Sequence, residues 1–174
     1  VLENSTGSMI HIGSPPLTEI SELGGRILNC VAKNVCQSNV MTAAGGVYKN
    51  HNEGAITFSA NAKNWVIDGL RVHTSGTGVL GSMDGDDINI SLFNSYAENC
   101  QFVIPTMGNG TSNIKLINNI FVDCGMLYAV SSGQAITNLT IKDNRFINTM
   151  FVFSNLNGFE FINNYVEDNA TFTW

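Results

Sequence analysis

The chain has 174 residues and a formal net charge of −6, and only 13% of its residues are charged. Its eight Lys and Arg residues are spread without a cluster, which argues against nucleic-acid and anionic-membrane partners. The sequence contains no run of about 18 apolar residues, so it predicts no transmembrane helix. It begins with Val rather than Met, and we expect a processed product or a piece of a longer protein.

A repeat organises most of the chain. Its clearest unit is residues 113–124, in which an Asn118-Asn119 pair separates two short runs of alternating apolar residues. The equivalent central residues of the regular units are Gly69, Asn94, Asn118, Asp143 and Asn163. They follow one another at steps of 25, 24, 25 and 20 residues. A fixed step of this size is the signature of a repeat protein whose equivalent positions stack on one another.

Apolar residues recur with a period of two within each unit, which is the period of a β-strand. Between the apolar positions lie mostly polar residues that we expect to face water. Asn, Asp and Gly at the central turn suit a residue in the left-handed conformation. We expect the stacked Asn side chains to bond along the axis. A second polar column, expected to be another corner, holds Thr74, Asn99, Asp123, Asn148 and Asp168.

These patterns predict an all-β fold, a right-handed parallel β-helix with three short strands and about 24 residues per coil. The sequence predicts a single domain over residues 1–174. Residues 1–23 are the irregular N-terminal segment, residues 37–54 form an excursion loop, and residues 64–174 form the regular coils. A leucine-rich repeat would need a Leu-x-x-Leu-x-Leu frame, which is absent.

The third strand of each coil has apolar residues on both of its expected faces, as in Phe102, Val103 and Ile104. Such a strand is usually covered on both sides. We therefore expect this face to pack against another subunit, as in a trimer along the axis, or against a further part of the same polypeptide. The alternative is that residues 1–23 or the excursion cover this face.

Two of the four cysteines, Cys100 and Cys124, hold the same place in consecutive repeats. Stacked coils lie about 4.8 Å apart, which is at the short end of the Cα separation for a disulfide. The two interpretations are a disulfide and a column of free, buried thiols, and we favour the free thiols.

The Asn-centred coils over residues 64–168 resemble the pectate-lyase-like β-helix superfamily, and within it phage tailspikes and capsule depolymerases. The resemblance implies action on polysaccharides and, for tailspikes, a homotrimer. It implies a place on the virion surface or outside the cell. It specifies a fold better than an activity.

The densest group of carboxylates is Asp84, Asp86 and Asp87, and their Gly-Asp-Asp segment resembles that of polygalacturonase-type hydrolases. Glycoside hydrolysis uses two carboxylates, so these residues are candidate catalysts. The same group could instead bind Ca²⁺. The third interpretation is a solvated turn, in which Asp is favoured for its local hydrogen bonds. No Cys/His cluster has zinc spacing, and we expect no other cofactor.

Glu98 is a further catalytic candidate, because register places it beside His73 of the preceding coil, where the two could share a proton. A surface hydrogen bond is the simpler interpretation of this pair. Tyr96 offers a surface on which a sugar could stack, and Glu53 lies in the excursion, where loops carry specificity.

The sequence therefore predicts a carbohydrate-binding β-helix of the tailspike type that recognises bacterial surface polysaccharide and could cleave it. If the chain is an enzyme, we expect a glycoside hydrolase or a related polysaccharide-degrading enzyme. The alternatives are a non-catalytic spike or adhesin shaft and a secreted polysaccharide hydrolase.

Overall fold

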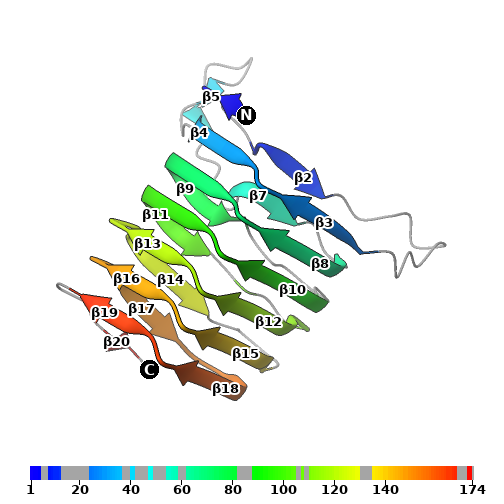
Figure 1. Ribbon diagram of the computed structural model, residues 1–174, viewed down its shortest axis with the longest axis vertical. Helices are drawn as coiled ribbons and strands as arrows, with labels where there is room; N and C mark the ends of the chain where they lie inside the picture. Colours follow the sequence, from blue (N-terminus) through cyan, green and yellow to red (C-terminus); the bar gives the residue numbers. More distant parts are fainter. Residues whose placement is uncertain are drawn as a thin grey trace.

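The computed structural model of the protein describes residues 1–4, 8–12, 24–36, 40–41, 47–48, 54–58, 62–81, 88–104, 107, 110–129, 135–167 and 172–173. Over these residues it is an all-β protein, a right-handed parallel β-helix whose coils stack along one axis (Figure 1). This confirms the predicted fold. The described residues include no helix long and apolar enough to cross a membrane.

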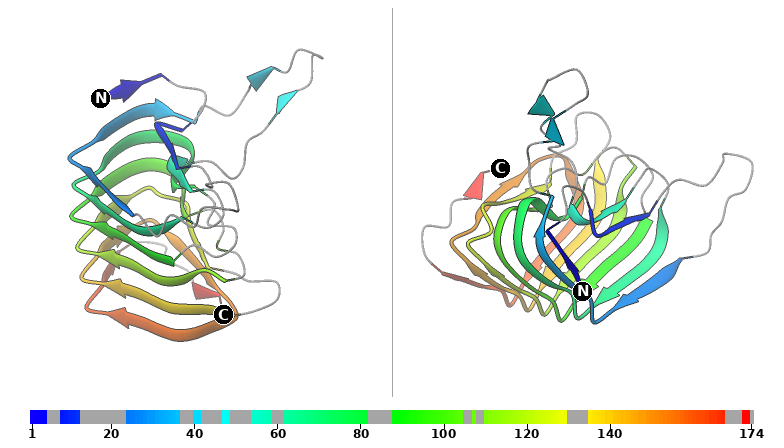
Figure 2. Two further views of the ribbon diagram at one scale, coloured as in Figure 1. Left: turned by 90° about the vertical axis from the view of Figure 1, so that its right-hand side faces the viewer. Right: turned by 90° about the horizontal axis from the view of Figure 1, so that it is seen from above.

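The first strand of each coil belongs to a six-stranded parallel sheet. Its strands, in stacking order, are β3 (Gly25–Leu28), β8 (Lys63–Asp68), β10 (Ile88–Phe93), β12 (Ser112–Ile117), β15 (Ile136–Lys142) and β18 (Leu156–Ile162). Register holds equivalent residues together, since Leu92 pairs with Ile67 on one side and with Leu116 on the other. Successive coils lie behind one another when the molecule is seen from above (Figure 2).

The second and third strands of the coils share a twelve-stranded sheet. Its main path is β1 (Leu2–Glu3), β4 (Val31–Val35), β9 (Arg71–Leu80), β11 (Tyr96–Ile104), β13 (Ile120–Val122), β16 (Arg145–Ile147) and β19 (Tyr165–Glu167). The third face adds β2 (Ile10–Ile12), β7 (Gly54–Phe58), β14 (Met126–Ala129), β17 (Met150–Phe153) and β20 (Phe172–Thr173). A separate antiparallel pair, β5 (Val40–Met41) and β6 (Val47–Tyr48), lies within the predicted excursion.

The corners are made by residues with positive φ, as the composition of the turns predicts. The six central turns have φ between 47° and 71°, at Asn29, Gly69, Asn94, Asn118, Asp143 and Asn163. The second corner is confirmed at Thr74, Asn99, Asp123 and Asn148. A third left-handed column falls at the first residue of each repeat, at Asn64, Asn89, Asn113, Asn138 and Gly158.

Side-chain amides link the coils in ladders at these corners. On the surface of the central turn, Asn118 donates to Asn94 at 2.7 Å and Asn94 donates to Asp68 at 2.8 Å. A second ladder lies one residue further along the chain and is buried, since Asn119 is 1% and Asn144 is 2% exposed. The backbone N–H of Asn119 donates to Asn144 Oδ1 at 2.9 Å, and that of Asn144 donates to Asn164 Oδ1 at 3.0 Å.

The core is a continuous column of aliphatic and aromatic side chains between the sheets. Phe146 stacks on Phe121 with ring centroids 5.2 Å apart and meets Phe151 edge-on at 4.9 Å. Cys100 and Cys124 are free and buried, which confirms the thiol interpretation. The Cys124 side chain and burial both raise the pKa of the Cys100 thiol well above its usual range.

The third face is largely buried within the single chain. All five residues of β7 are buried, and so are both Val79 and Leu80 at the end of β9. On β17, by contrast, buried and exposed side chains alternate: Phe151 and Phe153 are buried, and Met150 is 40% exposed. Over β7 and β9, then, no second subunit is needed to cover the apolar side chains, and the trimer stays a prediction.

Candidate functional site

The candidate site lies on the outer face of the second strand of the coils. Short strands between the central turn and the second corner alternate a buried residue, such as Val72, Ala97 or Phe121, with residues that face outward. We call the outward residues of this row the outward strip. From β9 to β19 they are Arg71, His73, Tyr96, Glu98, Ile120, Val122, Arg145, Ile147, Tyr165 and Glu167. All are at least partly exposed.

The structure brings three of the predicted site residues into contact on this strip. Register pairs Glu98 of β11 with His73 of β9, and Tyr96 lies two residues before Glu98 on the same strand. His73 Nδ1 is 2.7 Å from Glu98 Oε1, and the Tyr96 hydroxyl donates to Glu98 Oε2 at 2.6 Å. Both oxygens of the carboxylate are therefore engaged. The rings of His73 and Tyr96 are 5.9 Å apart at their centroids.

These contacts decide the charge that Glu98 carries. The hydrogen bond from His73, and then the one from Tyr96, lower the pKa of Glu98 below its ordinary value of 4.5. The hydrogen bond between Tyr96 and Glu98, together with burial, raises the pKa of the Tyr96 hydroxyl. Glu98 is thus an ionised carboxylate at neutral pH. It is suited to accept a proton or a hydrogen bond and not to act as a general acid.

A second arrangement on the strip repeats the first with one difference. Tyr165 is the register partner of Arg145, just as Tyr96 is the register partner of Arg71. Glu167 follows Tyr165 by two residues, but here the acid bonds to the arginine, with Arg145 Nη2 2.8 Å from Glu167 Oε2. This bond raises the pKa of the Arg145 guanidinium. The guanidinium also lies 5.6 Å from the centre of the Tyr165 ring.

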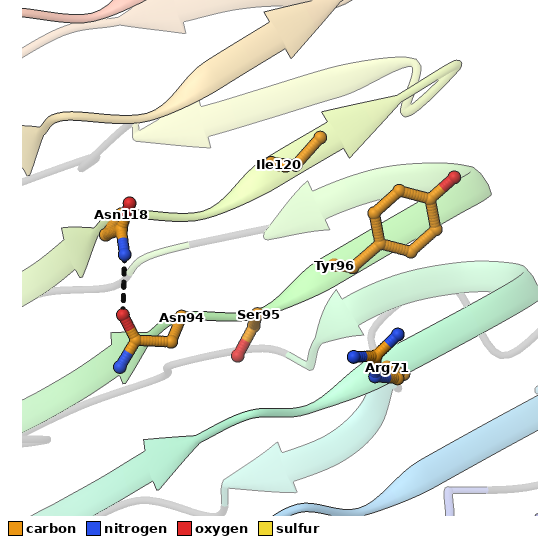
Figure 3. Close-up of a pocket in the computed structure, with 6 residues that line it drawn as sticks. All are labelled: Arg71, Asn94, Ser95, Tyr96, Asn118 and Ile120. Carbon is orange, nitrogen blue, oxygen red and sulfur yellow. Dashed lines mark hydrogen bonds between the residues drawn. The ribbon is translucent and has the colours of Figure 1, made fainter.

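A shallow hollow of about 330 Å³ opens beside the first arrangement (Figure 3). Figure 3 shows Arg71, Tyr96 and Ile120 on three successive strands, with the Asn94–Asn118 bond at the adjoining central turn. Ser95 completes the lining, and its hydroxyl is already used by the backbone, since it donates to Phe93 and accepts from Leu70. The hollow thus combines a cation, an aromatic ring, an aliphatic side chain and surface amides.

The remaining predicted site residues cannot be placed. Asp84, Asp86, Asp87 and Glu53 lie outside the described residues, so the carboxylate cluster, its Ca²⁺ alternative and the excursion acid stay predictions. In the part of the chain that is described, no group of three or more His, Cys, Asp or Glu side chains is arranged to hold a metal ion.

The two glutamates of the strip do not form a hydrolase pair. Val122 and Ile147 separate Glu98 from Glu167 in register, so three coil steps of about 4.8 Å place them about 14 Å apart. Inverting enzymes hold their carboxylates about 6.5–9.5 Å apart and retaining enzymes closer. Asp123 is the next acid near Glu98, since it follows Val122, the register partner of Glu98. Its Oδ1, however, accepts a hydrogen bond from Asn148 Nδ2 at 3.0 Å in the ladder of the second corner.

Sequence reasoning assigned no role to Arg71 or Arg145, and it missed Glu167. A signal for both was present, since Tyr96-Ala97-Glu98 and Tyr165-Val166-Glu167 repeat the same Tyr-x-Glu spacing, each one coil after an arginine. A scan of protein-family models and searches of curated proteins and of solved structures gave no match. The fold therefore defines the class, a parallel β-helix, and the strip is the basis for any functional assignment.

Proposed function

We propose that this chain is a carbohydrate-binding β-helix of the tailspike type, within the pectate-lyase-like superfamily, that recognises bacterial surface polysaccharide. The proposal places it on a virion or in the extracellular space. The observation that carries it is the outward strip, where two tyrosine rings with charged partners lie on a rigid surface three coils apart. Tyr165, on the last strand of the main path of the twelve-stranded sheet, is 58% exposed, and Tyr96, which lies between two neighbouring strands, is also partly exposed.

The chemistry of the strip suits a sugar chain. Pyranose rings have apolar faces and many hydroxyls, and tyrosine offers an apolar body with a polar tip. Carboxylates and amides beside the rings can bond the hydroxyls, and the regular rise of the coils provides a straight track. Recognition is the function that the described residues support. Cleavage would need a second acid beside Glu98.

The test is binding of the purified chain to a panel of immobilised bacterial capsular and surface polysaccharides. We expect saturable binding to at least one polymer, weakened about tenfold by Tyr165→Ala or Tyr96→Ala, in line with the usual cost of removing an aromatic anchor. The matched control is Lys115→Ala, which changes an exposed outward residue of β12 on the first sheet. Release of oligosaccharides from the bound polymer, lost in Glu98→Gln, would add catalysis to recognition.

A structural shaft is the second candidate, and the amide ladders favour it. Three corners of the coil carry inter-coil amide bonds, for example Asn118 to Asn94, Asn138 to Asn113 and Asn148 to Asp123. Such ladders stiffen a rod whether or not it binds anything. Failure of every polysaccharide to bind would overturn the recognition proposal and support the shaft.

A further inference from the structure

We infer that the hollow beside Arg71 binds the carboxylate of an acidic sugar residue, such as a uronic acid. This inference rests on the proposed function and adds a substrate class to it. It follows from the difference between the two Arg–Tyr–Glu arrangements on the outward strip, which share their register but not their hydrogen bonds.

The two arrangements differ at the residue two positions after each arginine, which faces the glutamate in register. In the second arrangement that residue is Ile147, which offers no hydrogen bond, and Glu167 bonds to Arg145. In the first it is His73, which takes one oxygen of Glu98 while the Tyr96 hydroxyl takes the other. His73 therefore holds Glu98 away from Arg71.

Arg71 is left with no acid of its own. Among the described residues it makes no side-chain hydrogen bond or salt bridge, and its neighbours in register are Val31 and Tyr96, neither of which is charged at neutral pH. A guanidinium presents its N–H groups as a planar fork that matches a carboxylate through two parallel hydrogen bonds. The strip thus holds one satisfied guanidinium, at Arg145, and one unsatisfied guanidinium, at Arg71.

The hollow supplies the rest of a monosaccharide site. Its volume of about 330 Å³ falls at the lower end of the usual range for small-molecule sites, about 300–1,000 Å³. Ile120 and the Tyr96 ring offer apolar surface (Figure 3). The surface ladder of the central turn ends at Asn118, because the next rung is Asp143, whose carboxylate side chain has no N–H to donate. The amide oxygen of Asn118 is therefore available to accept from a sugar hydroxyl.

The overall charge of −6 does not prevent this binding. Exposed charges are screened over about 8–10 Å at physiological ionic strength, so the nearby guanidinium dominates the potential inside the hollow. The carboxylate of Glu98 is the acid closest along the strip, and its two oxygens are already bonded.

The test is an NMR titration of isotope-labelled protein with sodium glucuronate, with glucose and with glucose 6-sulfate, following the Nε–Hε signal of Arg71. We expect saturable shifts with glucuronate in the millimolar range and binding of glucose at least tenfold weaker. Arg71→Gln should abolish the glucuronate effect. Lys115→Gln is the control, because it removes an exposed cation of β12 that lies outside the outward strip, and it should bind glucuronate within twofold of the unmodified protein.

The decisive variant leaves Arg71 in place. His73→Ile copies Ile147 of the second arrangement, frees Glu98 to bond to Arg71, and should weaken glucuronate binding at least tenfold. Unchanged glucuronate binding in Arg71→Gln or His73→Ile would overturn the inference, as would equal binding of glucose or tighter binding of glucose 6-sulfate. These outcomes are separate from the polysaccharide panel, where the absence of any binding overturns the proposed function itself.

Discussion

Two amide ladders run side by side along the central turn, one residue apart in the chain, and they differ in what surrounds them. Asn94 and Asn118 bond to each other on the surface, where water competes for every donor and acceptor. Asn119 and Asn144 form the same type of bond in the interior, where no water replaces a lost partner. The buried ladder therefore carries stability, while the exposed face is free to serve recognition.

The largest effect expected from this difference is on the buried ladder. Asn144 donates to Leu116 O and to Asn164 Oδ1, and its own Oδ1 accepts two bonds from Asn119. Asn144→Leu keeps the approximate shape of the side chain but removes one partner from the buried polar groups of Asn119 and Leu116, while Asn164 Oδ1 still accepts from the backbone N–H of residue 144. Each such group costs about 1–3 kcal/mol, so we expect a loss of about 3–5 kcal/mol in the free energy of unfolding, measured by urea denaturation.

The matched control for that variant is Asn118→Gly on the exposed ladder. Glycine keeps the left-handed backbone, at φ 56°, and removes only the surface bond to Asn94. We expect a loss of about 0.5 kcal/mol. Equal losses for the two variants would contradict the assignment of stability to the interior.

The fold could be predicted because its signals are local and repeated. A period of two, a step near 24 residues and Asn, Asp or Gly at each turn all indicate stacked strands, and the positive φ values confirm the turns. The sequence does not say which Asn of the Asn118-Asn119 pair is buried. Asn118 takes the left-handed conformation at the turn, and the chain leaves it in a direction that points the next side chain, that of Asn119, inward. Covering of the third face depends on contacts between distant segments, which no local pattern encodes.

The candidate site could be predicted in part. Register alone placed Glu98 beside His73, because stacking in a β-helix converts spacing in sequence into contact. It did not reveal that Tyr96 binds the second carboxylate oxygen or that Arg71 is left unpaired. Both depend on side-chain rotamers, and the same Arg–Tyr–Glu order yields a different bond where Ile147 replaces histidine. Asp84, Asp86 and Asp87 stay untested predictions.

The cysteines also divide between interior and surface, and we expect this to affect how fast their thiols react. Cys36, Cys100 and Cys124 are buried, whereas Cys30 is partly exposed. The raised pKa of Cys100 keeps it protonated, and only the thiolate reacts. We expect a water-soluble disulfide reagent at pH 8 to modify Cys30 at least about 100-fold faster than Cys100 in the folded protein. Mass spectrometry of partially labelled protein measures the order, and early labelling of Cys100 would place it outside the stable core.

The smallest effect belongs to the outward strip. Because hydrogen bonds from His73 and Tyr96 lower the folded pKa of Glu98, its ionised form contributes stability above its ordinary pKa of 4.5, and this contribution is lost as pH falls through the folded value. Glu98 is about one third exposed, so we expect Glu98→Gln to cost at most about 1 kcal/mol at pH 7. The difference between the two proteins should narrow by pH 3 in paired urea titrations. A penalty that is the same at both pH values would show that the lost contact depends on the shape of the side chain and not on its charge, and would weaken the case that His73 holds Glu98 away from Arg71.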